Sequence, residues 1–225
     1  RFPFLLLSFE REMGRKINDN INSFEYNIPM KKILVLASSN ENKVREIREM
    51  MPDGFEVLSM RDLNLHATKE ETGNTFEENA KIKAEDIASM TDYPVFSDDS
   101  GLEIDALGGF PGIHSARFME GHSYQEKCDE ILHRLEGKEN RKARFVTAMV
   151  YLDKKNGIEK TFFGVNEGKI ISSYPKGEQN GFGYDPIFFS DDLMMTFGEA
   201  DSVKKDEVSH RGRALREMIQ YLIKG

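Results

Sequence analysis

Continuous apolar runs and helix-spaced apolar residues alternate in the first half of the chain. Residues 32–37 (KILVLA) are almost entirely apolar, which is typical of a strand buried on both faces. Apolar residues at helical spacing follow within 44–51, and a short strand pattern stands at 55–58. A capping box at 75–78 (TFEE) predicts the start of a second helix. This alternation of strands and helices favours an α/β fold.

The second half of the chain has the pattern of antiparallel strands. Residues 144–152 form a long, mainly apolar run. Asn156-Gly157 is a strong signal for a two-residue hairpin that returns into a strand at 158–165. Residues 168–171 predict a third strand of this set, and the apolar spacing within 214–222 predicts a closing helix.

Two adjacent carboxylates, Asp98 and Asp99, stand between two apolar segments near the middle of the chain. We expect strands at 94–96 and 102–104, with the acidic pair at the point where the first strand ends. Ligands of α/β proteins gather at such strand ends. Because neighbouring carboxylates repel, the pair calls for a cation such as Mg²⁺ or for a proton. Alternatively, Asp-Asp-Ser-Gly is an ordinary turn, which this stretch alone would favour.

The polar stretch 38–43 (SSNENK) lies between the first predicted strand and the following helix. A strand that runs into a helix start leaves free backbone N–H groups, which bind phosphate well. Lys43 adds a cation, but the G-x-x-x-x-G-K pattern of phosphate loops is absent from the sequence. An ordinary helix cap followed by a solvated lysine explains the same residues, so both alternatives stay open.

Two later stretches combine polar and aromatic groups. The glycine-rich loop 177–186 carries Phe182 and Tyr184, whose rings either stack on a flat base or cover the edge of the core. Ser209 is a plausible helix cap, which places His210 and Arg211 in the first helical turn. Cations are unfavourable there, so either a polar ligand or simple surface solvation must account for them.

Composition narrows the class of protein. The chain of 225 residues is 39% hydrophobic and 31% charged, as in soluble globular proteins, and its net charge of −8 argues against a nucleic-acid-coating surface. The single cysteine, Cys128, excludes an internal disulfide framework and favours a cytoplasmic location. No apolar run approaches the roughly 20 residues that span a membrane. Residues 1–29 precede Met30 and are expected to be an extension outside the domain, which covers residues 30–225.

Five separated segments, taken in order, resemble the inosine/xanthosine triphosphate pyrophosphatases, which remove deaminated purine nucleotides. These segments are 38–43, 70–80, 98–102, 181–186 and 209–211, and residues 108–112 and 115–117 fit the same family. Each motif alone is weak, but the ordered set is specific and covers about residues 31–224. Ser38 stands where the family often has threonine, which keeps the hydroxyl, and Asn180 stands where glycine is common.

The resemblance implies an elongated mixed β-sheet in two lobes, flanked by helices around a central substrate cleft, usually in a homodimer. It implies Mg²⁺-dependent hydrolysis of ITP, dITP and XTP to the monophosphate and pyrophosphate. Asp99 would be the base that activates water, and Glu70 and Asp99 would carry Mg²⁺. The triphosphate would be held by Ser38, Ser39, Asn40, Glu41, Asn42 and Lys43, with Lys83 and Lys205 as further cations. Ser100 would touch the substrate, and the base would be surrounded by Phe182, Gly183, Tyr184, Asp185, His210 and Arg211.

Three other functions compete with this interpretation. A Maf-type pyrophosphatase acting on other nucleotides is the nearest, and a non-catalytic nucleotide-binding module is another. A haloacid-dehalogenase-type phosphatase would also use paired aspartates. It would carry a D-x-D-x-T run after the first strand, however, where Ser38-Ser39-Asn40 stands instead.

Overall fold

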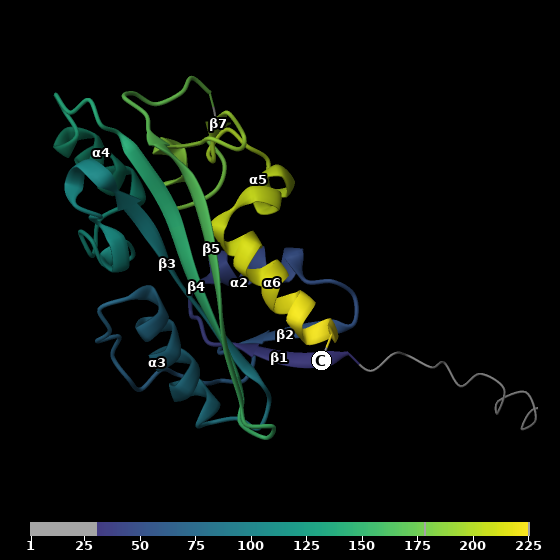
Figure 1. The fold of residues 1–225 in the computed structure, drawn as a ribbon. Coiled ribbons are helices and arrows are strands. Elements are labelled where there is room, and N and C mark those ends of the chain that lie inside the picture. Colours follow the sequence, from purple (N-terminus) through teal and green to yellow (C-terminus); the bar gives the residue numbers. More distant parts are fainter. Residues whose placement is uncertain (1–30, 178, 225) are drawn as a thin grey trace, which may run out of the picture. The chain divides into compact units, whose positions relative to one another are not determined.

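A seven-stranded mixed sheet organises the part of the chain described by the computed structural model, residues 31–177 and 179–224 (Figure 1). The strand order is β2-β1-β3-β4-β5-β6-β7, with β1 parallel to β2 and β3 and every later pair antiparallel. The strands are β1 (Lys32–Leu36), β2 (Phe55–Ser59), β3 (Val95–Ile104), β4 (Lys142–Asp153), β5 (Ile158–Ile170), β6 (Phe188–Ser190) and β7 (Met195–Thr196). The predicted extension 1–29 lies outside the described residues.

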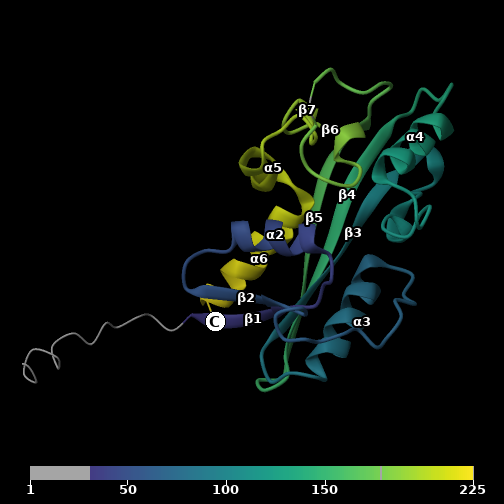
Figure 2. The same cartoon turned by 180° about the vertical axis from the view of Figure 1, so that it is seen from behind.

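Helices cover both faces of this sheet. They are α2 (Glu41–Met50), α3 (Phe76–Ala88), α4 (Tyr124–Arg134), α5 (Ser202–Val208) and α6 (His210–Lys224), with short 3-10 turns η1 (Asp105–Leu107), η2 (Gly112–His114) and η3 (Asp185–Ile187). Figures 1 and 2 show α3 on the opposite side of the sheet from α2 and α6. None of the helices in the described ranges combines the length and the apolar character needed to cross a membrane.

Three apolar clusters divide this domain into two lobes. Strand alternation sends Leu34 toward α2 and α6 and Val35 toward α3, which gives one cluster on each face of the first lobe. The third cluster packs Leu102 of β3 against Ile131 of α4 and Phe188 of β6 in the second lobe. The long strands β3, β4 and β5 run through both lobes, as the family resemblance implies.

The two short strands expected around Asp98 and Asp99 are in fact one continuous strand. All ten residues of β3 pair with β4, with Asp99 opposite Ala148 and Ser100 opposite Thr147. This long partner outweighs the local turn preference of Asp, Ser and Gly, so the turn interpretation is wrong as well. The register with β1 covers only Val95 and Phe96, so the acidic pair stands just beyond the carboxyl end of β1.

Two other sequence predictions need correction. The predicted hairpin after β4 forms, with Gly157 at a positive φ of 65°. Its loop has four residues, 154–157, rather than two, because Asp153 pairs with Ile158. The separate strand predicted at 168–171 is wrong, because β5 continues unbroken to Ile170 along its twelve-residue partner β4. Helix α5 was not predicted, because its seven residues are mostly charged and carry no apolar period. It nevertheless has a capping residue, Asp201, which accepts from the Lys204 N–H.

Two glycines allow loops to pack directly on the sheet. A Cβ atom at Gly101 would clash with the carbonyl oxygen of Gly112 and the hydroxyl of Ser115. A Cβ atom at Gly164 in β5 would clash with the carbonyl oxygen of His210. These positions therefore bring the η2 segment and the start of α6 close to the middle of the sheet.

Candidate functional site

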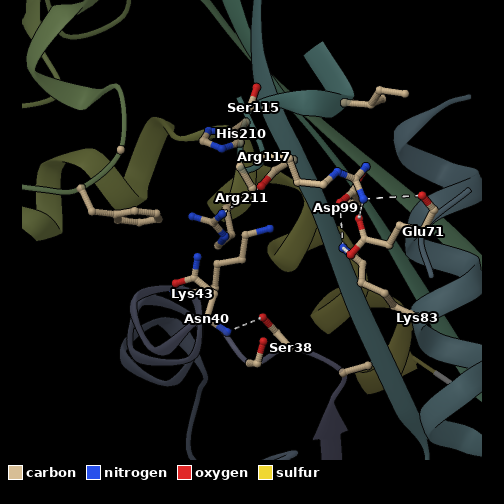
Figure 3. A pocket seen from close by; sticks show the side chains of 18 of the residues that line it. Ser38, Asn40, Lys43, Glu71, Lys83, Asp99, Ser115, Arg117, His210 and Arg211 are labelled. Carbon is tan, nitrogen blue, oxygen red and sulfur yellow. Dashed lines mark hydrogen bonds and ion pairs between the residues drawn. The ribbon is translucent and has the colours of Figure 1, made fainter. Parts of the chain in front are cut away.

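A cavity of about 360 Å³ opens beyond the carboxyl end of β1, between the two lobes (Figure 3). Its volume lies in the range of sites for small molecules, about 300–1,000 Å³. Fourteen of the predicted site residues line it, and they come from segments far apart in the sequence. They are Ser38, Ser39, Asn40, Lys43, Lys83, Asp99, Ser100, Phe182, Gly183, Tyr184, Asp185, Lys205, His210 and Arg211.

The loop after β1 is a helix cap as well as a wall of the cavity. Asn40 accepts hydrogen bonds from the backbone N–H groups of Asn42 (3.0 Å) and Lys43 (3.3 Å). These two N–H groups are therefore not the free phosphate donors that the sequence suggested. The loop instead offers the side chains of Ser38 and Ser39 and the ammonium of Lys43. Glu41 and Asn42 are exposed and do not belong to the described residues that line the cavity.

A buried charge network borders the cavity and joins α2, β3, η3, α5 and α6. Its members are Lys43, Glu46, Asp98, Asp185, Lys205 and Arg211. Asp98 binds Lys43 Nζ at 2.9 Å and Arg211 Nε at 2.6 Å. Lys205 Nζ lies 2.7 Å from both Glu46 and Asp185, and Glu46 also pairs with Arg211. Three cations and three carboxylates thus neutralise one another.

The network favours the charged forms of Asp98 and Arg211. Burial alone would raise the pKa of Asp98, but Arg211 and Lys43 together hold it well below its usual range. Burial would lower the pKa of Arg211, and its partners Asp98 and Glu46 raise it instead. Burial lowers the pKa of Lys43, with Asp98 opposing this effect. Asp98 and Arg211 are therefore charged at neutral pH.

Asp99 points away from this network, because successive side chains of a strand alternate between its two faces. Its Oδ1 lies 2.7 Å from Lys83 Nζ of α3, and Lys83 also donates to the Asp98 carbonyl oxygen at 2.9 Å. Its Oδ2 is buried and has no hydrogen-bond partner among the described residues. Burial raises the pKa of Asp99 above that of an ordinary aspartate. The two neighbouring aspartates therefore meet different side-chain cations, Lys43 and Arg211 for Asp98 and Lys83 for Asp99.

Glu71, rather than the predicted Glu70, lies at the cavity together with Asp99. Glu71 lines the cavity with Oε1 3.6 Å from Lys83 Nζ, whereas Glu70 is exposed and lies outside the described cavity lining. Two tethers to α3 fix the loop on either side. Thr68 and Lys69 donate to Asp86, and the Gly73 N–H donates to Asn79. Adjacent residues of an extended loop point in different directions, so sequence alone does not tell which glutamate faces inward.

Glu71 and Asp99 do not form a closed metal site, but they suit a magnesium ion that also binds the substrate. The described residues contain no group of three or more His, Cys, Asp or Glu side chains placed to hold a metal. Mg²⁺, however, usually takes one or two carboxylates together with substrate phosphates and water. Lys83 occupies only one oxygen of Asp99, so its protein partner does not saturate this carboxylate, which remains available to an ion or a water.

The other end of the cavity is aromatic. His210 stacks on Phe145 with ring centroids 4.7 Å apart and an angle of 9° between the ring planes. The Phe182 ring lies 5.1 Å from Lys205 Nζ, and Ser209 caps α6 by accepting from the Gly212 N–H, as predicted. Tyr184 is buried and its hydroxyl donates to the Ser115 carbonyl oxygen at 2.8 Å. It therefore joins two loops, and this leaves the Phe182 and His210 rings to meet a flat ligand.

His210 is expected to stay neutral throughout the physiological pH range. Burial lowers its pKa well below the ordinary value of 6.5, and the adjacent Arg211 lowers it further. The check is an NMR pH titration of the histidine ring signals, with His210 assigned by its loss in His210→Gln. The ring should remain neutral from pH 8 down to 5.5. A midpoint near 6.5 would contradict this electrostatic account.

Several residues at the cavity were not selected from the sequence. Glu71, Phe145, Ser115 and Arg117 line it, and Glu46 belongs to the buried charge network. Ser115 and Arg117 belong to a matched family motif to which no role was given. Phe145 lies in an apolar strand, and this pattern does not tell whether a side chain lines a cavity or packs in the core.

Comparisons with known proteins agree with the motifs. A family model described as the Ham1 family matches residues 34–221. A dITP/XTP pyrophosphatase of Exiguobacterium sp. is 47% identical over 191 residues, covering 82% of this chain and 94% of that protein. Another from Dictyoglomus thermophilum is 44% identical over 196 residues, covering 85% and 95%. The solved structure of a HAM1 protein from Coxiella burnetii is similar with a TM-score of 0.78 at 35% identity, covering 86% of this chain and 99% of that one. The chain therefore belongs to the Ham1 family.

Proposed function

We propose that this chain hydrolyses the deaminated purine nucleoside triphosphates ITP, dITP and XTP to the nucleoside monophosphate and pyrophosphate. The observation that carries the proposal is Asp99, a buried carboxylate at the cavity with one oxygen held by Lys83 and the other unpartnered among the described residues. The similar proteins of Exiguobacterium sp. and Dictyoglomus thermophilum are dITP/XTP pyrophosphatases, which supports dITP and XTP as substrates.

Asp99 is the proposed general base. Lys83 fixes its Oδ1, so that Oδ2 takes the proton of the attacking water, and a raised pKa makes this carboxylate a stronger base. The water oxygen forms a bond to the α-phosphorus. The bond from that phosphorus to the bridging oxygen breaks, and pyrophosphate leaves.

We assign Mg²⁺ binding to Glu71 and Asp99 together with the phosphates of the substrate. The bound ion would neutralise charge on the phosphate chain and stabilise the departing pyrophosphate. Ser38, Ser39 and Lys43 face the cavity from the loop after β1 and would hold the remaining phosphate oxygens. Asp98 holds the Lys43 ammonium at 2.9 Å, so the positive charge of Lys43 is already in place before the phosphates bind.

The choice of base follows from hydrogen-bond chemistry. Hypoxanthine and xanthine present an acceptor oxygen at position 6, whereas adenine presents an amino donor there. Arg211 donates to Asp98, Glu46 and Ser100 and has further N–H groups, and a neutral His210 has one ring donor. Adenine would leave such buried donors unpaired at a cost of about 1–3 kcal/mol each, which is the proposed source of discrimination.

Phe182→Ala is expected to raise the KM for ITP about tenfold, because base–aromatic stacking contributes roughly 1–3 kcal/mol. The KM for a pyrimidine triphosphate should change less, since a smaller ring gains less from stacking. Phe163→Ala, which removes an exposed ring of β5, is the matched control. Equal changes for purine and pyrimidine substrates would show that Phe182 does not select the base.

Identification of the reaction products tests the proposed function. With Mg²⁺ and ITP, chromatography should find inosine monophosphate and pyrophosphate in equal amounts. Inosine diphosphate with orthophosphate would indicate a phosphatase instead, and intact ITP bound without turnover would favour a non-catalytic module. A homodimer and a cytoplasmic location remain predictions, drawn from the family resemblance and from the single cysteine.

A further inference from the structure

Arg117 is a cation at the cavity to which neither the motifs nor the proposed mechanism gives a role. Its Nη1 lies 3.7 Å from Glu71 Oε2 and donates to the Glu71 carbonyl oxygen at 3.5 Å. Figure 3 shows its side chain reaching toward Glu71 on the side of the cavity where Asp99 and Lys83 lie. It therefore faces the two carboxylates that are assigned to catalysis.

The backbone that carries Arg117 is fixed at several points. The Ser115 hydroxyl accepts from the Leu102 N–H of β3 and donates to the Gly112 carbonyl oxygen. The Ser115 carbonyl oxygen accepts from Tyr184, and the Ala116 carbonyl oxygen accepts from Lys127 at 3.0 Å. The Arg117 N–H donates to His114 at 2.9 Å. These hydrogen bonds hold the backbone of residues 115–117 in place, so the Arg117 side chain extends from a fixed position.

The guanidinium itself is held loosely. Its side chain keeps 43% of its accessible surface, and its contacts with Glu71 are longer than any in the buried charge network. Arginine has five N–H donors in a fork that matches phosphate oxygens, and most of them are left over by these contacts. Lys43, Lys205 and Arg211 are in contrast neutralised by buried carboxylates at short distance.

We propose that Arg117 binds the phosphate chain of the substrate, and that the phosphates compete with Glu71 for its guanidinium. This inference rests on the proposed function. Arg117 would give up its weak contact with Glu71 and make a bidentate contact with the pyrophosphate that leaves. Arg117 would thus contribute a positive charge beside Glu71, to which Lys83 is also close.

The test is calorimetric binding of inorganic pyrophosphate in the presence of EDTA, so that no metal contributes. Arg117→Ala should weaken binding about tenfold, since a hydrogen bond to a charged group contributes on that scale. Arg117→Lys should lose part of this affinity. Glu71→Gln should bind at least as tightly as the parent protein, because it releases Arg117. Arg45→Ala, an exposed arginine paired with Glu49 at 4.0 Å, should change nothing.

Two results would overturn the role of Arg117. One is unchanged pyrophosphate affinity in Arg117→Ala, while the parent protein still hydrolyses ITP. The other is equal weakening in Arg117→Ala and Glu71→Gln, which would mean that the pair only clamps two loops together. A parent protein that neither hydrolyses ITP nor binds pyrophosphate would instead refute the proposed function itself. If Arg117→Ala fails to fold, Arg117→Lys and Arg117→Gln provide the same comparison.

Discussion

Asp99→Asn is expected to lower kcat for ITP by about 10²–10⁴-fold, the usual contribution of a general base. The amide has the same shape as the carboxylate but takes no proton at Oδ2, and it also removes a charge from the Glu71–Asp99 pair. Pyrophosphate release from ITP with Mg²⁺ measures the effect. The fold should remain intact, since β3 keeps its full register with β4.

Asp105→Asn is the matched control for this substitution. Asp105 is exposed and directly follows β3, so the loss of its charge should leave kcat unchanged. Circular dichroism of both variants would show whether the fold is retained. Full turnover by a folded Asp99→Asn protein would remove Asp99 from the mechanism.

Asp98→Asn is expected to cause the largest loss of stability, about 3–5 kcal/mol, because removing one partner of a buried ion pair leaves the others uncompensated. Asp98 is 1% exposed and bridges Lys43 and Arg211. Without it, two buried cations face each other with less opposing charge. Urea unfolding measures the effect, again with Asp105→Asn as control. An unchanged unfolding midpoint would show that Asp98 in the buried charge network does not stabilise the fold.

The pH dependence of this loss has a definite sign. Because its partners depress the pKa of Asp98 in the folded chain, its stabilising contribution is complete above the ordinary aspartate pKa of about 3.9. It then declines as the pH falls further, since the unfolded chain takes up the proton first. The difference between the parent protein and Asp98→Asn should therefore be constant from pH 8 to 5 and shrink below pH 4.

Much of the first lobe was predictable because its signals are local. The apolar run 32–37 and the helical spacing after it gave β1 and α2, and the same period gave α6. The continuity of β3 was not predictable in this way. It depends on ten residues of β4 that lie about fifty positions later, and no local preference of Asp98-Asp99-Ser100 reports that partner.

The candidate site shows the same division. Matched motifs brought together twelve cavity residues from four separated segments, and the family resemblance added Lys83 and Lys205. Periodicity alone would not have joined these residues. The Glu46–Arg211 pair, in contrast, connects residues 165 positions apart. The sequence around neither residue indicates that the other is its partner. The capped N–H groups of Asn42 and Lys43 and the inward turn of Glu71 depend on side-chain directions, which spacing does not give.

The decisive measurement is kcat/KM for pyrophosphate release with Mg²⁺ across ITP, dITP, XTP, ATP, GTP and the pyrimidine triphosphates. If the distant segments grip a deaminated purine triphosphate, ITP and XTP should exceed ATP by at least about 100-fold, since two unpaired buried donors cost that much. Equal turnover of ATP, or no pyrophosphate from any of these nucleotides, would contradict the account.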